Sequence, residues 1–297
     1  MKVLLTGSSG QLGKKIKSNL RNDLEIISPP SSEFDLSKPN SLKKLIRHIE
    51  PNLIINSAAY TNVDNAEVEQ DLSFLINSES PKIIAQEANL LSIPLVHIST
   101  DYVFDGSKEG LYLETDRPSP LNVYGESKFV GEKNVLECHD QAFVLRASWI
   151  YDSYGNNFLN TILRLLISEE EISVVKDQIG SPTSVETIVH TLDSVVARIL
   201  DLNNNPKPFN YGIYHFCSEG SASWYDFAKK IKEHCKLSTH TAEISPILSS
   251  EYNYIAERPL NSRLSCNKIM KEFGVKQTDW KTQLVRVMSK HPFNNAI

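Results

Sequence analysis

"KVLLTGSSGQLG", residues 2–13, decides the fold of this chain. Its apolar first half, KVLLT, predicts a buried strand that stops at Gly7. Gly7, Gly10 and Gly13 then form a G-x-x-G-x-x-G pattern that opens a helix over residues 11–22. A glycine turn between a strand and a helix exposes backbone N–H groups to an anion, so this order predicts a dinucleotide phosphate loop. The alternative is a plain glycine-rich turn.

Strands and helices alternate from this loop to about residue 150. Apolar runs predict strands at 24–28, 52–58, 94–100 and 142–148, and amphipathic stretches predict helices at 41–50, about 64–92 and 120–137. Continuously apolar strands are expected where helices cover both faces of a parallel sheet. We therefore predict an α/β fold with a doubly wound, Rossmann-type parallel sheet. Ligands of such sheets bind at the carboxyl ends of the strands.

The pattern loosens after residue 151, which indicates a smaller α/β unit for substrate binding. We predict an NAD(P)-binding Rossmann domain from residues 1–150 plus roughly 184–212. The substrate-binding domain is expected to comprise roughly 151–183 plus 213–297. The two units are therefore expected to be intertwined in sequence.

Composition narrows the classes of function. The 297 residues carry a formal net charge of −5 and no Lys/Arg-rich block, which argues against nucleic-acid and membrane partners. No apolar run approaches the length of a membrane span, and the first residues do not resemble a signal peptide. The four cysteines are widely spaced without metal-site spacing, so we expect free thiols, a cytoplasmic location and no metal.

Two further stretches predict the chemistry. The fourth strand ends in STDYVF, which places Thr100 at the ligand edge, and YGESK places Tyr124 and Lys128 on one helix face. A nearby ammonium lowers the pKa of a tyrosine by stabilising its phenolate. Tyr124 is then expected to protonate a carbonyl oxygen that Thr100 holds, while hydride reaches the carbon. The alternative is an ordinary Tyr/Lys pair on a solvated helix face.

The end of the second strand bears on the cofactor. An acidic residue there commonly binds the adenosine ribose of NAD, but the sequence reads IISPPSS, with no carboxylate before Glu33. This favours NADPH and leaves NADH possible. Asp35 either borders the adenine or caps the next helix.

The motifs TGSSGQLG, STDYVF and YGESK together resemble the extended short-chain dehydrogenase/reductase family. More narrowly, NSAAYTNVDNAE (56–67), PLNVYGESKFVGE (120–132), LRASWIY (145–151), DQIGSPTS (177–184) and RPLNSRL (258–264) resemble its dTDP-4-dehydrorhamnose reductase branch. The likeness runs from residue 1 to about residue 280.

The resemblance implies reduction of the 4-keto group of dTDP-4-dehydro-L-rhamnose by NAD(P)H, the last step of dTDP-L-rhamnose synthesis. It implies that Tyr124 donates the proton, Lys128 binds the nicotinamide ribose and lowers the tyrosine pKa, and Thr100 orients the substrate. The implied cofactor contacts are Gly7, Gly10, Gln11, Leu12, Asp35, Leu36, Ala58, Ala59, Tyr60, Thr61, Tyr124 and Lys128. The implied substrate contacts are Thr100, Asp101, Tyr124, Trp149, Val63 and Arg258.

Several alternatives stay open. Trp149 is a sugar contact or a core aromatic, while Arg258 and Arg263 bind the substrate diphosphate or form surface salt bridges. The same motifs also resemble a non-catalytic NADP-binding regulatory subunit, the β subunit of methionine adenosyltransferase. A nucleotide-sugar epimerase or a reductase for another 4-keto sugar is a further possibility.

The sequence departs from the family in one place. Some members form a dimer through a magnesium site of glutamates, one of them on the first helix. Lys14 and Lys15 occupy that stretch here, and lysine cannot bind Mg²⁺. We therefore expect a monomer or a dimer that no metal bridges.

Overall fold

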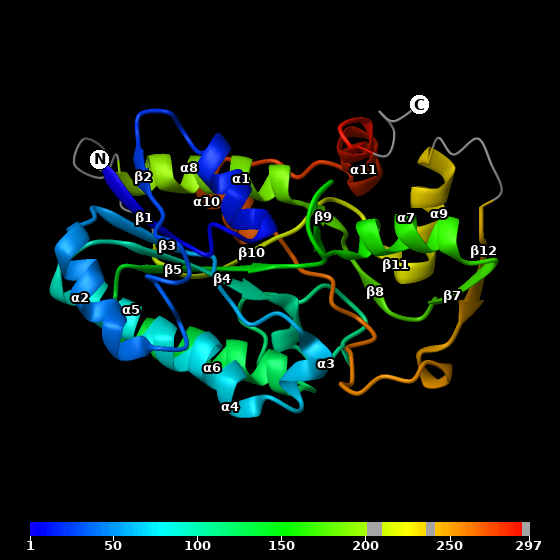
Figure 1. The fold of residues 1–297 in the computed structure, drawn as a ribbon, viewed down its shortest axis with the longest axis horizontal. Coiled ribbons are helices and arrows are strands. Elements are labelled where there is room, and N and C mark those ends of the chain that lie inside the picture. The colour runs from blue at the N-terminus through cyan, green and yellow to red at the C-terminus, as the bar shows by residue number, and fades with distance from the viewer. Residues whose placement is uncertain (201–209, 236–240, 293–297) are drawn as a thin grey trace.

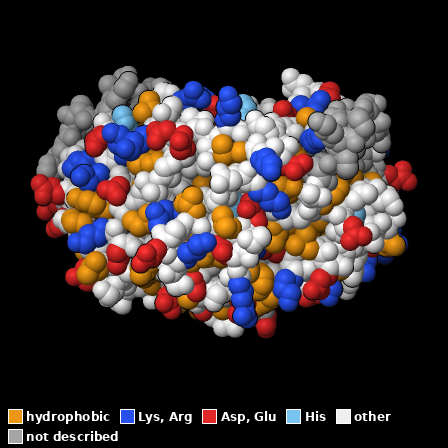
Figure 2. All heavy atoms as spheres, turned by 180° about the vertical axis from the view of Figure 1, so that it is seen from behind, with side chains coloured by type: hydrophobic (Ala, Val, Ile, Leu, Met, Phe, Trp, Pro, Cys, Tyr) orange, Lys and Arg blue, Asp and Glu red, His pale blue; other side chains and the backbone are white. Residues whose placement is uncertain are grey.

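The computed structural model describes residues 1–200, 210–235 and 241–292, and it has two units side by side (Figure 1). The larger unit is a sheet between two helical layers, and the smaller unit lies beside it at the carboxyl ends of the central strands. On the face shown in Figure 2, Lys and Arg side chains are interspersed with Asp and Glu. Within the described ranges, no helix is long and apolar enough to cross a membrane.

The larger sheet has six parallel strands in the order β10-β5-β4-β3-β1-β2. The strands are β1 (Lys2–Thr6), β2 (Glu25–Ile27), β3 (Leu53–Asn56), β4 (Leu95–Thr100), β5 (Ala142–Ala147) and β10 (Gly212–Phe216). The order reverses at β1 and β3, and a crevice at such a switch point is where doubly wound sheets bind ligands. The predicted Rossmann-type sheet is confirmed.

Helices cover both faces of this sheet. One layer contains α1 (Gln11–Asn19), α8 (Val185–Leu200) and α10 (Asn267–Phe273), and the other contains α2 (Pro39–Ile49), α5 (Ser80–Leu90) and α6 (Val123–Cys138). Alternate residues of β1 pack against the two helical layers. Val3 and Leu5 pack toward α1, while Leu4 packs toward α2.

The predicted helical region over about 64–92 breaks once, after α3 (Val63–Ala66), and then runs without a gap through α4 (Gln70–Phe74), the π-helical turn η1 (Leu75–Glu79) and α5. Pro81 lies in the first turn of α5 and has no N–H to bond the carbonyl of Asn77. The wider π-helical turn ahead of the proline accommodates the backbone without that hydrogen bond. The break matters because η1 and α4 pack against α6.

The smaller unit has its own core. Its main elements are α7 (Phe158–Ser168), β7 (Glu171–Val175), α9 (Trp224–His234), β12 (Glu243–Ile247) and α11 (Trp280–Ser289). Two-residue strands join the units: β6 (Ile150–Tyr151) pairs with β9 (Thr183–Ser184), and β8 (Ile179–Gly180) with β11 (Ala222–Ser223). Short 3-10 turns lie at η2 (Asp101–Val103) and η4 (Ser249–Glu251).

The pairing of β10 corrects the predicted boundary. The smaller unit was expected to include everything after residue 213, yet β10 pairs with β5 along its whole length, and α10 shares the core of α8. A five-residue apolar strand carries no signal for the sheet that it joins, so periodicity could not place it. Residues 201–209 of the predicted Rossmann segment lie outside the described residues.

Candidate active site

The three predicted catalytic residues meet at the carboxyl end of β4. Thr100 is the last residue of β4, while Tyr124 and Lys128 lie on the first two turns of α6. Asn122 caps α6 by accepting a hydrogen bond from Gly125 N at 2.8 Å, which defines where the helix begins. Its amide also donates to Glu257 O at 2.6 Å and so joins α6 to the chain segment that leads to Arg258.

Tyr124 is placed to give a proton. Burial raises its pKa to about 12, a hydrogen bond with Thr100 acts in the opposite direction, and the charge of Asp101 adds to the rise. The hydroxyl therefore stays protonated at neutral pH. The ring of Tyr102 packs edge-on against it at a centroid distance of 5.8 Å.

Lys128 is buried behind Tyr124. Its side chain donates from Nζ to Ile98 O at 2.7 Å. Burial lowers the pKa of this amine to about 8, while the charge of Glu132 raises it. The net pKa of Tyr124 is thus raised and not lowered as expected, with burial as the largest cause, and a contribution of Lys128 that acts against burial stays a prediction.

Asp101 follows Thr100 and lies beneath the same site. Its carboxylate accepts hydrogen bonds from Thr100 Oγ1 and Ser148 Oγ, each at 3.1 Å. Burial raises its pKa to about 6, and the hydrogen bonds from Ser148 and Thr100 work against that rise. Its side chain is held by the protein, so a direct contact with the sugar stays a prediction.

The phosphate loop has the geometry of an anion cradle. Gly7 adopts a φ of +72°, and a Cβ on Gly13 would lie 2.1 Å from Gly7 O, so no side chain fits there. Gly10 caps α1 without a side-chain hydrogen bond, and the first turn of α1 has no acidic residue. The N–H groups at the start of α1 can therefore receive a phosphate.

The side chains beside this loop make contacts within the protein. Gln11 donates from Nε2 to Ile150 O at 3.2 Å and accepts from Asn157 Nδ2 at 3.1 Å, which joins α1 to the smaller unit. Leu12 is buried in the core against α8. A cofactor contact at these two positions is therefore best expected from the backbone.

The loop after β3 is also held in place. Ala58 N donates to Thr6 Oγ1 at 3.3 Å, and the backbone of Tyr60 is clamped by Asn77, with bonds of 2.8 Å and 3.0 Å. The Tyr60 hydroxyl donates to Glu69. Ala59 and Thr61 complete this loop at the surface beside β1 and β3.

Asp35 neither caps the next helix nor points freely toward a ligand. Its carboxylate accepts from Ser37 N at 2.9 Å and Ser37 Oγ at 2.7 Å, which lowers its pKa, and it pairs with Lys38 at 3.2 Å. The cap position of α2 belongs to Lys38. Leu36 packs in the core with Leu42. The adenine contacts of Asp35 and Leu36 stay predictions.

A cavity of about 290 Å³ lies between the two units, beside Tyr102. Its walls combine aromatic and charged side chains, among them Asp64, Tyr102, Phe158, Trp224, Tyr254 and Arg258. Val63 starts α3, the helix that carries Asp64 into this wall. Thr100, Tyr124 and Lys128 do not line the cavity themselves, and the ring contact of Tyr102 with Tyr124 links its wall to the catalytic candidates.

Trp149 is not a core residue. Its ring is stacked on that of Trp224 with a centroid distance of 3.4 Å and an interplanar angle of 2°. Its φ of +46° is unusual for a bulky residue, and strained backbone of this kind persists where the surroundings hold it. Gly180 makes room for it, since a Cβ there would lie 2.3 Å from the indole.

Of the two arginines, only Arg258 lines the cavity. It pairs with Asp64 at 2.8 Å and stacks on Tyr254 with its guanidinium carbon 4.4 Å from the ring centroid. Arg263 instead donates to Asn261 Oδ1 at 2.8 Å and to Glu109 O. Arg258 therefore forms a salt bridge, which was one of the two alternatives, and it also lines the cavity, where the other alternative requires it in order to bind the substrate diphosphate.

Sequence reasoning did not single out three wall residues of the cavity and one residue beside the catalytic candidates. Asp64, Trp224 and Tyr254 line the cavity, and Glu132 lies behind Lys128. The only signals were a carboxylate inside the 56–67 motif and an aromatic residue at the start of a predicted helix. Neither distinguishes a cavity wall from a surface.

Lys15 of α1 lies near Glu186 of α8. Glu186 pairs with Lys290 at 2.6 Å, and the charge of Lys15 also lowers the Glu186 pKa. Among the described residues, His, Cys, Asp and Glu form no group of three that could hold a metal ion.

A family model described as the RmlD substrate binding domain matches residues 1–292. The chain belongs to this family. A relative of this RmlD-family chain from Sinorhizobium fredii (strain NBRC 101917 / NGR234), named dTDP-4-dehydrorhamnose reductase, is 36% identical over 289 residues, 97% of each chain. A Bacillus subtilis (strain 168) relative, named spore coat polysaccharide biosynthesis protein SpsK, is 36% identical over 284 residues, 95% of each.

A solved structure agrees with the RmlD-family fold. The dTDP-4-dehydrorhamnose reductase from Bacillus anthracis str. Ames, in complex with NADP, is 37% identical and superposes with a TM-score of 0.89. The match covers 97% of this chain and 99% of that one. The predicted family is therefore confirmed.

Proposed function

We propose that this chain is an NADPH-dependent dTDP-4-dehydrorhamnose reductase, which reduces the 4-keto group of dTDP-4-dehydro-L-rhamnose. The observation that carries the proposal is the contact between Tyr124 and Thr100 at the carboxyl end of β4, between the phosphate loop and the cavity. The family match and the names of the full-length relatives support the substrate.

The residues present fit a dinucleotide. The side-chain-free cradle of Gly7 and Gly13 would receive the pyrophosphate at the start of α1. The held loop of Ala58 to Thr61 would lie along the cofactor, and Lys128 would bind its ribose. NADPH is favoured because Ser28 follows β2 where NAD-specific sheets place a carboxylate, and the B. anthracis structure holds NADP. NADH remains the alternative cofactor.

Bound NADPH supplies the hydride. Thr100 and Tyr124 hold the carbonyl oxygen of the sugar by hydrogen bonds, which places the 4-carbon for attack. As the C–H bond forms, the carbonyl π pair moves to oxygen, and Tyr124 gives that oxygen its proton. Even with a pKa near 12, the phenol is a stronger acid than the alcohol produced, so this transfer runs downhill. The charge of Lys128 stabilises the phenolate that is left until solvent returns the proton.

The cavity fits the rest of a nucleotide sugar. Aromatic rings of Trp224, Phe158 and Tyr254 offer faces for a planar base. Arg258 offers a fork for phosphate oxygens, provided that its bond to Asp64 rearranges. We propose Trp149 and Val63 as neighbours of the sugar because they flank this cavity through Trp224 and Asp64.

The test is a turnover assay. Purified protein, dTDP-4-dehydro-L-rhamnose and either NADPH or NADH are mixed, and the absorbance of the reduced cofactor is followed while the sugar product is identified. We expect oxidation with NADPH, slower oxidation with NADH, and dTDP-L-rhamnose as product. No oxidation with either cofactor contradicts the proposed substrate.

Two rivals give different outcomes in the same preparation. A regulatory subunit would bind NADPH and co-purify with a synthetase partner without turnover. An epimerase would release tightly bound NAD⁺ when freshly purified protein is denatured. A cytoplasmic location and a monomer, or a dimer without a metal bridge, complete the proposal, and sedimentation with and without a chelator tests the assembly.

A further inference from the structure

A buried ion pair lies one helical turn behind Lys128. Glu132 on α6 and Arg146 on β5 are each only 1% exposed, with Nη2 and Oε2 2.6 Å apart. Arg146 Nε adds bonds of 2.9 Å and 3.1 Å to the two carboxylate oxygens. Such a pair contributes little net stability compared with well-packed apolar residues, because both charges are desolvated. Its position therefore calls for another explanation.

The pair joins the elements that carry the site. Glu132 accepts a hydrogen bond from Ser99, the neighbour of Thr100 on β4. Arg146 stacks on Phe104 with its guanidinium carbon 5.1 Å from the ring centroid and contacts His215 Nε2 at 3.3 Å. Glu132 is thus bonded to both strands that end at the site, four residues along α6 from Lys128 and eight from Tyr124.

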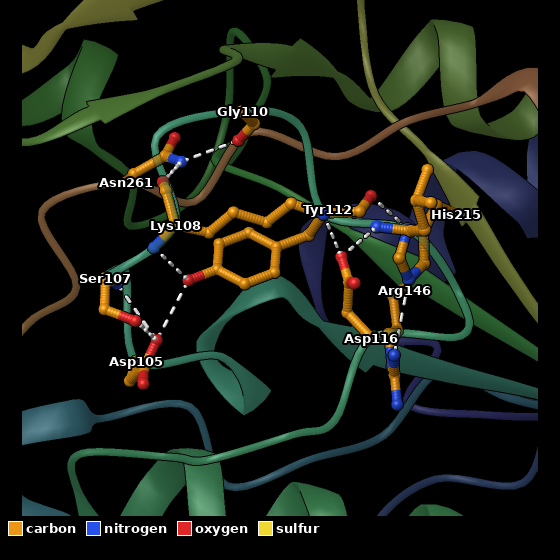
Figure 3. A network of polar contacts seen from close by, with 10 residues as sticks. Asp105, Ser107, Lys108, Gly110, Tyr112, Asp116, Arg146, His215 and Asn261 are labelled. Carbon is orange, nitrogen blue, oxygen red and sulfur yellow. Dashed lines mark hydrogen bonds and ion pairs between the residues drawn. The ribbon is translucent and has the colours of Figure 1, made fainter.

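Arg146 is also held by a contact on the side away from Glu132. Burial and the charge of Arg146 lower the pKa of His215 to about 3, so its imidazole is neutral. Its Nδ1 lies 3.2 Å from Tyr112 O, which can only accept, so Nδ1 carries the hydrogen and Nε2 accepts from Arg146. Figure 3 shows Arg146 and His215 beside Tyr112. This contact leaves the guanidinium aimed at Glu132.

The groups that face Lys128 are few. On its own helix they are Tyr124 and Glu132, and from β4 the buried His97, whose pKa is lowered by burial and by the lysine charge. The other charged residues on the elements that pack against α6 are Asp64 on α3, Asp71 on α4, Glu79 on η1, Lys82 and Glu87 on α5, Asp101 on η2 and Arg146 on β5. Of these, Glu87 is engaged by Arg47, Asp64 by Arg258 and Arg146 by Glu132 itself. Of all these groups, Glu132 is the one that favours the charged form of Lys128.

We propose that Glu132 is a positioning residue for the reduction: held by Arg146 and Ser99, its carboxylate keeps the buried Lys128 charged and fixes α6 against the end of β4. This rests on the proposed function, because Lys128 is there taken to bind the cofactor ribose and to stabilise the phenolate. The cation of the site then depends on a carboxylate that touches neither cofactor nor substrate.

The experiment separates charge from packing. E132Q alone leaves Arg146 buried without its partner, so E132Q/R146M, which removes both charges, is the main variant. R146K is the matched control, because it disturbs the two-pronged geometry and retains the Glu132 carboxylate. For each folded variant, NADPH affinity and kcat/KM are measured from pH 6 to about pH 9, the range around the lysine pKa.

We expect the alkaline limb of both profiles to move about one pH unit lower in E132Q/R146M, the size of shift that a nearby opposite charge produces. The limb should stay in place in R146K. An unmoved limb in the folded double variant overturns the proposal, and so does an equal shift in R146K. The binding profile needs no turnover, so the inference is tested even if the substrate assignment fails.

Discussion

The two walls of the site are built in different ways. The catalytic wall comes from strand ends and one helix, and backbone bonds and burial hold Thr100, Tyr124 and Lys128. The recognition wall is assembled from α3, α9 and the chain before β8 and α10, and ring stacking and the Arg258–Asp64 pair hold it together. On the proposed function, the chemistry takes place at the wall held by backbone bonds and burial, where small displacements are costly. Substrate recognition then falls to the wall built from side chains of both units.

We expect the largest loss of activity from a substitution in the catalytic wall. Y124F removes the proton donor, so kcat should fall by about 10²- to 10⁴-fold, the usual contribution of a general acid. NADPH affinity should stay within a few-fold, as measured by cofactor fluorescence. Y102F is the matched control, since it takes a hydroxyl from the adjacent ring and should mainly change KM. A Y124F rate near that of the unaltered protein removes Tyr124 from the mechanism.

The recognition wall should respond through KM. W224A deletes the ring that stacks on Trp149, and a lost aromatic contact of about 1 kcal/mol plus lost burial predicts a rise in KM of about tenfold. Kcat and NADPH affinity should change little. W224F preserves a stacking face and should recover most of the affinity. If W224A lowers kcat as strongly as Y124F, the division between the walls is wrong.

The smallest effect is one of stability and tests the burial of Asp101. Its pKa of about 6 in the folded protein lies above the unfolded value of 3.8, so its ionisation opposes folding as pH rises through this window. D101N removes that charge, and its unfolding free energy should exceed that of the parent by about 1–3 kcal/mol at pH 8. The difference should vanish below about pH 3, where Asp101 is protonated in both the folded and the unfolded protein.

The control variant for this prediction, D105N, should change the unfolding free energy in the opposite direction. Asp105 accepts bonds from Ser107 and Tyr112 (Figure 3), which lower its pKa, so its ionised form favours folding above the unfolded value. D105N should therefore be less stable than the parent at pH 8 and approach it at low pH. Thermal unfolding at several pH values measures both variants. Curves for D101N and D105N that change in the same direction contradict the assignment.

Much of the fold follows from local patterns. The predicted strands lie within one or two residues of β1 to β5, because apolar runs bounded by turns are visible without tertiary information. The predicted helical region over about 64–92 is present, but the turn after α3 and the π-helical turn ahead of Pro81 carry no signal in the apolar periodicity. The candidate site residues at strand ends lie close together because Rossmann topology brings those ends to one edge.

The sequence by itself determined the glycine cradle, the order of strands and helices, and a tyrosine and lysine on one helix face, since each depends on residues close in the chain. Tertiary structure alone decided that β10 joins the sheet, that Trp149 stacks on Trp224, and that burial raises the pKa of Tyr124. It also placed Arg146 on Glu132 behind Lys128. The reason is physical: desolvation and long-range pairing depend on how many neighbours exclude water, and no spacing along the chain records that.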